Sequence, residues 1–200
     1  MRAASLLFGL FLFAVGLAAF IESELGVPPW DVFHQGVARR TPLTFGLAII
    51  LVGLVVLAVA WLAGQRPGIG TLANSLFVGA YLEGLTRIGW IAELSERGVA
   101  PRAALLLVGV SLTALGTAFY IGAAFGAGPR DGLMLVLSAR TGRRIAIVRA
   151  VLEVAVLIAG IALGGTAGLG TLLFAVLIGP AVEASFALLL RSPLVEGPSG

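Results

Sequence analysis

The chain has 200 residues, of which 59% are hydrophobic and only 12% are charged, and its formal net charge is +3. Soluble domains carry roughly 25% charged residues, so this composition excludes an ordinary soluble domain and predicts an integral membrane protein. All the basic residues are Arg and they lie between apolar runs, where they orient a membrane protein, so we exclude nucleic-acid binding. The absence of Cys excludes disulfides and thiolate metal sites.

Six apolar runs are long enough to cross a bilayer, which takes about 20 mostly apolar residues. The first run resembles a signal peptide, but later runs are equally apolar and a copy of it recurs, so we interpret it as a span. The predicted transmembrane helices cover Ser5–Ile21, Leu43–Ala63, Thr71–Ile91, Ala103–Phe125, Ile145–Leu163 and Thr171–Leu190.

Two short helical segments, Asp31–Arg40 and Asp131–Arg140, follow the first and fourth spans. At about 1.5 Å per residue, helices of this length reach roughly halfway through a hydrocarbon core about 30 Å thick. We expect half-helices that are either re-entrant or interfacial. If both crossed fully, each half would have four spans and the repeats would be parallel.

The second half of the chain is a copy of the first, because a shift of one hundred residues aligns them without a gap. The matches with most weight are polar, glycine and proline residues: Arg2/Arg102, Gly26/Gly126, Pro29/Pro129, Asp31/Asp131, Arg40/Arg140, Thr41/Thr141, Gly68/Gly168, Thr71/Thr171 and Glu83/Glu183. We therefore predict an all-α polytopic protein, a single membrane domain over residues 1–200, with repeats at about 1–93 and 101–193. Three long spans per repeat make the second repeat inverted relative to the first, as in many secondary transporters.

Each Pro-x-Asp segment has two interpretations. Proline and aspartate suit a helix start, so Asp31 and Asp131 would cap their own helices. Alternatively, the two half-helix N-termini point at a substrate. The first short helix is amphipathic and the second apolar all round, so we expect the first to be partly wet and the second buried. This makes Trp30, His34 and Gln35 further candidates for substrate binding.

Three glutamates lie inside predicted spans, where an ionisable group is by default a functional hypothesis. Glu183 has no partner one turn away, so we predict that it binds a coupling proton or cation. Glu83 precedes Arg87 by four residues, and Glu153 follows Arg149 by four. For Glu83 and Glu153, a structural ion pair and a coupling role both stay open.

The glycine motifs favour helix packing. In each half a Gly-x-Gly-Thr sequence, Gly68–Thr71 and Gly168–Thr171, predicts a tight turn between helices and not a phosphate loop, which would need a preceding strand. Small residues two turns apart on the first span of each half predict close helix contact; they are Gly9, Gly16, Gly109 and Gly116.

Several motifs carry a family resemblance. The sequence GVPPWDVFHQG followed by TPLTFG, then RPGIGT and the second-half GAGPRDG, resembles the YczE/YyaS/YitT-type family of bacterial multi-pass membrane proteins over nearly the whole chain. The resemblance implies a bacterial plasma (inner) membrane location, but no substrate and no site residues. The Arg cluster between residues 140 and 149 predicts a cytoplasmic N-terminus.

These features favour a small secondary transporter or permease of unknown substrate with a midplane site between inverted repeats. The alternative is a non-transporting scaffold or regulatory protein that acts through helix-helix partners. A single His and no Cys leave no catalytic constellation, so we expect no enzyme, no metal and no cofactor. The expected partners are the lipid bilayer, a small solute and a second copy of the chain.

Overall fold

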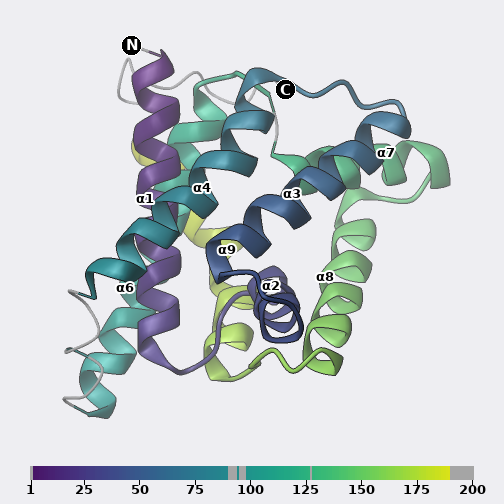
Figure 1. The fold of residues 1–200 in the computed structure, drawn as a ribbon. Coiled ribbons are helices and arrows are strands. Elements are labelled where there is room, and N and C mark those ends of the chain that lie inside the picture. The colour runs from purple at the N-terminus through teal and green to yellow at the C-terminus, as the bar shows by residue number, and fades with distance from the viewer. Residues whose placement is uncertain (1, 90–93, 95–97, 127, 190–200) are drawn as a thin grey trace.

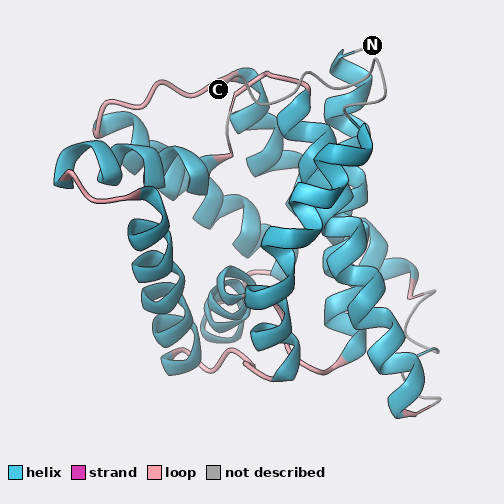
Figure 2. Ribbon diagram, turned by 180° about the vertical axis from the view of Figure 1, so that it is seen from behind, coloured by secondary structure: helices cyan, strands magenta, loops and turns pink. Residues whose placement is uncertain are grey.

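A computed structural model describes the chain except residues 1, 90–93, 95–97, 127 and 190–200, and the side chains of 145 and 146 (Figure 1). The described residues form helices and loops without a strand, which confirms the predicted all-α class (Figure 2). The helices are α1 (Arg2–Ser23), α2 (Pro29–Arg40), α3 (Phe45–Leu62), α4 (Ile69–Ile88), α6 (Val99–Gly122), α7 (Pro129–Thr141), α8 (Ile145–Ala162) and α9 (Leu169–Leu189).

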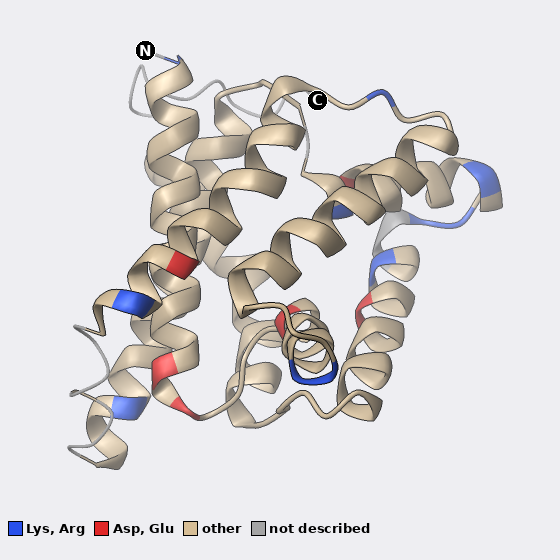
Figure 3. Cartoon of the chain, viewed as in Figure 1, with Lys and Arg blue, Asp and Glu red and all other residues tan. Residues whose placement is uncertain are grey.

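The predicted long runs coincide with α1, α3, α4, α6, α8 and α9 within a few residues, and the two short segments are α2 and α7. Run ends expected at 91 and 190, and repeat ends expected at 93 and 193, lie outside the described residues. Four described helices, α1, α3, α6 and α9, are long and apolar enough to cross a membrane. Charged residues are sparse along the long helices (Figure 3). Membrane crossing by α4 and α8 stays a prediction.

Helices α1 and α6 pack antiparallel along a glycine seam. Gly9 faces Gly116 and Gly16 faces Gly109, so the residue numbers increase along one helix in the direction in which they decrease along the other. A Cβ atom built on Gly9 would lie 2.6 Å from the backbone nitrogen of Tyr120. The two backbones can approach this closely only because these positions have no side chain.

The Gly-x-Gly-Thr turn of each half is hydrogen-bonded to the loop that precedes the short helix of the other half. Gly70 donates a backbone hydrogen bond to the carbonyl of Phe125 at 2.8 Å, and Gly170 donates one to Leu25 at 2.7 Å. In both turns the Thr hydroxyl accepts from the first Gly N–H, as the pair Gly168 and Thr171 shows at 3.1 Å. The motif thus does more than form the predicted helical turn, because it also joins the two halves.

The short helices also cross over to the other half. Helix α2 packs on α8, and α7 packs on α3. Arg40 donates to the Leu163 carbonyl at 3.2 Å, at the end of α8, and Arg140 donates to the Ala63 carbonyl at 2.8 Å, at the end of α3. Cations at helix C-termini satisfy free carbonyls and oppose the negative end of the dipole. Each short helix therefore caps a long helix of the other half.

The two halves differ in how their last two long helices pack. Helix α3 lies along α4, whereas α8 makes no comparable contact with α9 in the described part of the chain, and it stands apart at one edge of the molecule (Figure 1). A Cβ atom built on Gly79 of α4 would lie 2.5 Å from Ile50 of α3. One built on the equivalent Gly179 of α9 meets nothing within 4 Å. The α3–α4 side is closed, and the α8–α9 side is open.

Candidate binding cavity

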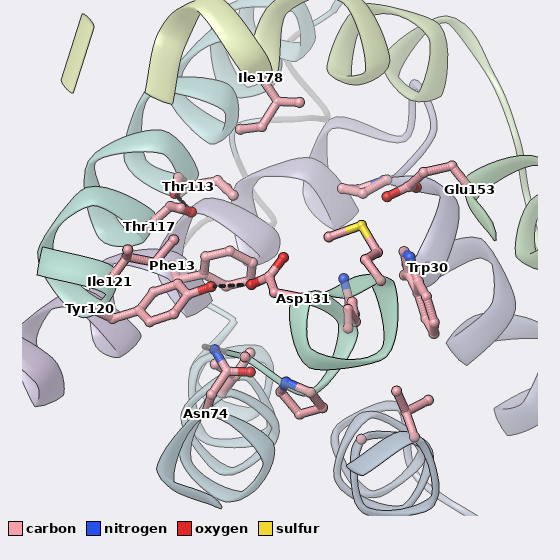
Figure 4. A pocket seen from close by; sticks show the side chains of 18 of the residues that line it. Phe13, Trp30, Asn74, Thr113, Thr117, Tyr120, Ile121, Asp131, Glu153 and Ile178 are labelled. Carbon is pink, nitrogen blue, oxygen red and sulfur yellow. Dashed lines mark hydrogen bonds between the residues drawn. The ribbon is translucent and has the colours of Figure 1, made fainter. Parts of the chain in front are cut away.

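A cavity of about 360 Å³ lies between the two halves and borders both short helices (Figure 4). Its volume falls in the range of small-molecule sites. Both members of many residue pairs related by the hundred-residue shift line it: Phe13/Thr113, Pro28/Gly128, Trp30/Arg130, His34/Met134, Ile49/Arg149, Val52/Leu152, Gly53/Glu153, Asn74/Phe174 and Val78/Ile178. The cavity is therefore built from equivalent positions of the two repeats.

Asp131 caps its own helix and also faces the cavity. Residue Gly128 is the N-cap of α7, and the Asp131 carboxylate accepts a hydrogen bond from its backbone N–H. The carboxylate also accepts one from the Tyr120 hydroxyl at 3.3 Å (Figure 4). This arrangement is half of a capping box, in which an acidic side chain in the first turn reaches back to the N-cap.

Asp31 sits at the same position of α2 but cannot make the same contact. The N-cap of α2 is Pro28, which has no N–H to donate. Instead Oδ1 of Asp31 lies 3.0 Å from Nδ1 of His34, and Oδ2 has no hydrogen-bond partner among the described residues. Asp31 is only 2% exposed and does not line the cavity, whereas His34 does.

The expectation of a partly wet first short helix and a buried second one is wrong. Trp30, Asp31 and His34 of α2 are all buried, whereas few residues of α7 are. The contact between Asp31 Oδ1 and His34 Nδ1 lowers the cost of burying these two polar side chains of α2. Amphipathicity therefore did not indicate contact with water here.

All the formally charged residues that line the cavity come from the second half; they are Arg130, Asp131, Arg149, Glu153 and Glu183. The guanidinium of Arg130 lies over the Trp30 ring, 4.9 Å from its centroid, in cation–π geometry. Glu153 interacts with the indole of the same Trp30 (Figure 4). For Glu153 the sequence left open an ion pair with Arg149 and a coupling role; no Arg149–Glu153 salt bridge is present among the described residues, and Glu153 interacts with Trp30 instead.

Besides Asp31, two further sequence candidates lie outside the cavity lining. Gln35 accepts a hydrogen bond from the backbone N–H of Thr166 at 3.1 Å and so contributes to the contact between α2 and the loop after α8. Glu83 forms the ion pair with Arg87 at 3.1 Å, and it also accepts a hydrogen bond from Thr44. The structure thus brings Trp30, His34, Asp131, Glu153 and Glu183 to one cavity and leaves Gln35 and Glu83 out.

Several cavity residues were not singled out from the sequence. Arg130 lies inside the second Pro-x-Asp motif, at the position that Trp30 occupies in the first. This difference between the two motifs could have identified Arg130 as a candidate from the sequence. Tyr120 and Thr117 lie on α6, within a run interpreted only as a span. Thr113 is 1% exposed, and its hydroxyl has no partner among the described residues. Nothing in the apolar pattern of α6 distinguishes these residues from lipid-facing ones.

The comparisons identify the family. The model described as "Family of unknown function (DUF6198)" matches residues 1–186. The chain belongs to this family. An uncharacterized protein of Haemophilus influenzae is 37% identical over 194 residues, covering 94% of this chain and 84% of that protein. The family resemblance noted from the sequence is confirmed, since two Bacillus subtilis relatives carry its names.

Those relatives are the uncharacterized membrane protein YczE, 34% identical over 86% of this chain and 79% of that protein, and the uncharacterized protein YyaS, 26% identical over 82% of each. No solved structure matches. Together with the apolar helices, the family places this chain among membrane proteins. The names of the family and of these relatives state no activity, so the functional argument rests on the cavity.

Proposed function

We propose that this protein is a small secondary transporter whose substrate site is the cavity between two inverted repeats. The observation that carries the proposal is the lining itself, in which equivalent residues of both halves face one space. A site at the interface between repeats is the arrangement that allows access to alternate between the two sides of a membrane.

The packing supports the inverted arrangement. The first helices of the two halves are antiparallel, and each short helix and each Gly-x-Gly-Thr turn binds the opposite half. In our proposal α1, α3, α4, α6, α8 and α9 cross the bacterial inner membrane, and α2 and α7 are re-entrant. The N-terminus lies in the cytoplasm.

The cavity supports ligand binding and coupling without covalent chemistry. Trp30, His34 and Asp131 offer an aromatic face, a ring nitrogen and a carboxylate to the substrate. Glu183 of α9 lines the cavity, where we assign it the binding of a coupling proton or cation. We propose no enzymatic activity, metal or cofactor for this site.

Thiol accessibility tests the proposal without knowledge of the substrate, and the chain provides a background without Cys. Val52 of α3 lines the cavity, whereas Val55 of the same helix is 62% exposed on the outside. We expect a Val52→Cys thiol to react with a membrane-impermeant maleimide in both right-side-out and inside-out vesicles. A Val55→Cys thiol should face lipid and react from neither side.

Reaction of Val52→Cys from one side only, under every condition tested, would contradict alternating access. A partner that copurifies at fixed stoichiometry, combined with no two-sided reaction, would instead favour the scaffold alternative. Both variants replace a valine on one helix, so a difference between them reports location and not the chemistry of the substitution.

A further inference from the structure

We propose that the cavity binds a small zwitterion that carries one cationic group, one anionic group and an apolar remainder. This inference deepens the proposed function and rests on it only for the movement of the ligand across the membrane. The cavity is the part of the molecule where charged side chains from three helices meet, and the argument follows their arrangement.

The first step is the balance of charge in the cavity. Asp131 accepts hydrogen bonds from Tyr120 and Gly128, and these neutral donors leave its negative charge in place. Four further charged side chains line the space: two guanidinium groups, Arg130 and Arg149, and two carboxylates, Glu153 and Glu183. Charged groups of both signs therefore face the cavity. A ligand that carries one cationic and one anionic group can compensate side chains of both signs.

The second step is that the opposite charges lie near one another without pairing. Glu153 is influenced electrostatically by both Arg130 and Arg149. Among the described residues neither guanidinium comes within 4.0 Å of a carboxylate in an ion pair. Separated charges in an apolar surrounding are costly unless a partner satisfies both. An ammonium group at Glu153 and a carboxylate at an Arg, which can bind it through two hydrogen bonds, would do so.

The third step concerns the uncharged part of the ligand. Helix α3 lines the cavity with Ile49, Val52 and Val56, and α9 adds Ile178 and Val182. Figure 4 shows Glu153 and Trp30 on one side of the space, Tyr120 and the α6 threonines on the other, and Ile178 at one end. A charged head at Glu153 therefore leaves room for an apolar group against aliphatic side chains. A branched hydrocarbon group fits this lining better than a polyol does.

Three leucine-related probes separate the chemical classes. Leucine carries both charges, 3-methylbutylamine lacks the carboxylate, and 4-methylpentanoate lacks the ammonium group, while the hydrocarbon part is retained. We expect leucine, phenylalanine or glycine betaine to raise the thermal unfolding midpoint of the purified protein, and we expect the two singly charged analogues to bind at least tenfold more weakly than leucine.

Matched variants locate the binding. Glu153→Gln and Arg130→Gln should each weaken zwitterion binding at least tenfold. The control variants Glu83→Gln and Arg87→Gln alter an ion pair outside the cavity and should leave the dissociation constant unchanged. Isothermal titration in detergent gives the constants, and a retained unfolding midpoint without ligand shows that each variant is folded.

Two results would overturn the assignment: no shift with any of the three zwitterions, or an amine or carboxylate that binds as tightly as leucine. Failure of this inference is distinguishable from failure of the proposed function. Two-sided thiol access without zwitterion binding would reject the ligand class alone. Zwitterion binding with one-sided access would retain the site and reject transport.

Discussion

At the residue scale, one difference at a helix start explains why Asp31 and Asp131 have different hydrogen-bond partners in the two short helices. Gly128 offers its N–H to Asp131, whereas Pro28 has none to offer to Asp31. The carboxylate of Asp31 turns to His34 instead, and the position equivalent to His34 in the second half is Met134. Pro28 occurs with His34 and Gly128 with Met134, so the equivalent carboxylate has a different hydrogen-bonding partner in each half.

This explanation predicts a rescue. His34→Met should remove the hydrogen-bonding partner of the buried Asp31 carboxylate and lower stability by about 3 kcal/mol. Adding Pro28→Gly to that variant should restore much of the loss, because the new N–H can donate to Asp31 as Gly128 does to Asp131. The unfolding midpoint in detergent, followed by tryptophan fluorescence, measures both steps.

Pro28→Gly alone is the control, and it should lower the midpoint slightly because glycine adds freedom to the unfolded chain. A double variant that is no more stable than His34→Met would show that Asp31 does not reach the N-cap. The interpretation of the Asp31–His34 pair as a substitute cap would then be wrong.

At the element scale, the α1–α6 seam holds the two halves together. It brings helices from opposite halves together at positions without side chains, and fully buried residues such as Leu10 and Phe20 lie on α1. Close approach between backbones gains dispersion contacts that lipid cannot replace. The sequence pattern of paired glycines predicted close packing, but not which helices were partners.

Filling the seam should separate the helices. A Cβ atom on Gly116 would lie 2.6 Å from the backbone oxygen of Gly9, so Gly116→Leu should lower stability by at least about 1–3 kcal/mol. The control is Gly84→Leu on α4, where a Cβ meets nothing within 4 Å. Leucine favours a helix over glycine, so the control should be neutral or stabilising.

Unfolding midpoint and monodispersity on size-exclusion chromatography measure both glycine variants. Equal midpoints for Gly116→Leu and Gly84→Leu would mean that the seam does not carry the contact between the halves.

At the scale of the whole molecule, two halves of similar sequence adopt different packing. The α3–α4 side is closed and the α8–α9 side is open. Under the proposed function these are the two forms that each half adopts in turn. Closure of α8 onto α9 would then accompany separation of α3 from α4.

Cysteine pairs test this exchange. Ile50→Cys with Gly79→Cys joins positions in contact across α3 and α4 and should form a disulfide rapidly on oxidation. Ala150→Cys with Gly179→Cys joins the equivalent positions on α8 and α9 and should react more slowly, in proportion to the population of the closed form. Loss of maleimide labelling, confirmed by mass spectrometry, measures each rate. An α8–α9 pair that never reacts in membranes would contradict an exchange of conformations between the halves.

Hydropathy and residue spacing were enough to predict the membrane class, the approximate limits of the helices, the shortness of α2 and α7, and the duplication. These follow from hydropathy and spacing along the chain, which are local properties. The sequence also indicated functional candidates: Glu183 as an ionisable group inside a span, Asp131 as part of a half-helix start, and Trp30 as part of the first short helix.

Only the tertiary structure decided which of these candidates share a cavity. Trp30 contacts Arg130 and Glu153 because each short helix packs against the opposite half. These residues are more than a repeat's length apart in the sequence, so no local sequence pattern predicts the contact. The same folding brings Gln35 to the loop after α8, whereas the Glu83–Arg87 ion pair is a local contact that the sequence had offered as one possibility. The difference between the closed α3–α4 side and the open α8–α9 side was also visible only in the structure. Two halves of similar sequence predict equivalent packing, and the contacts between helices depend on the whole fold.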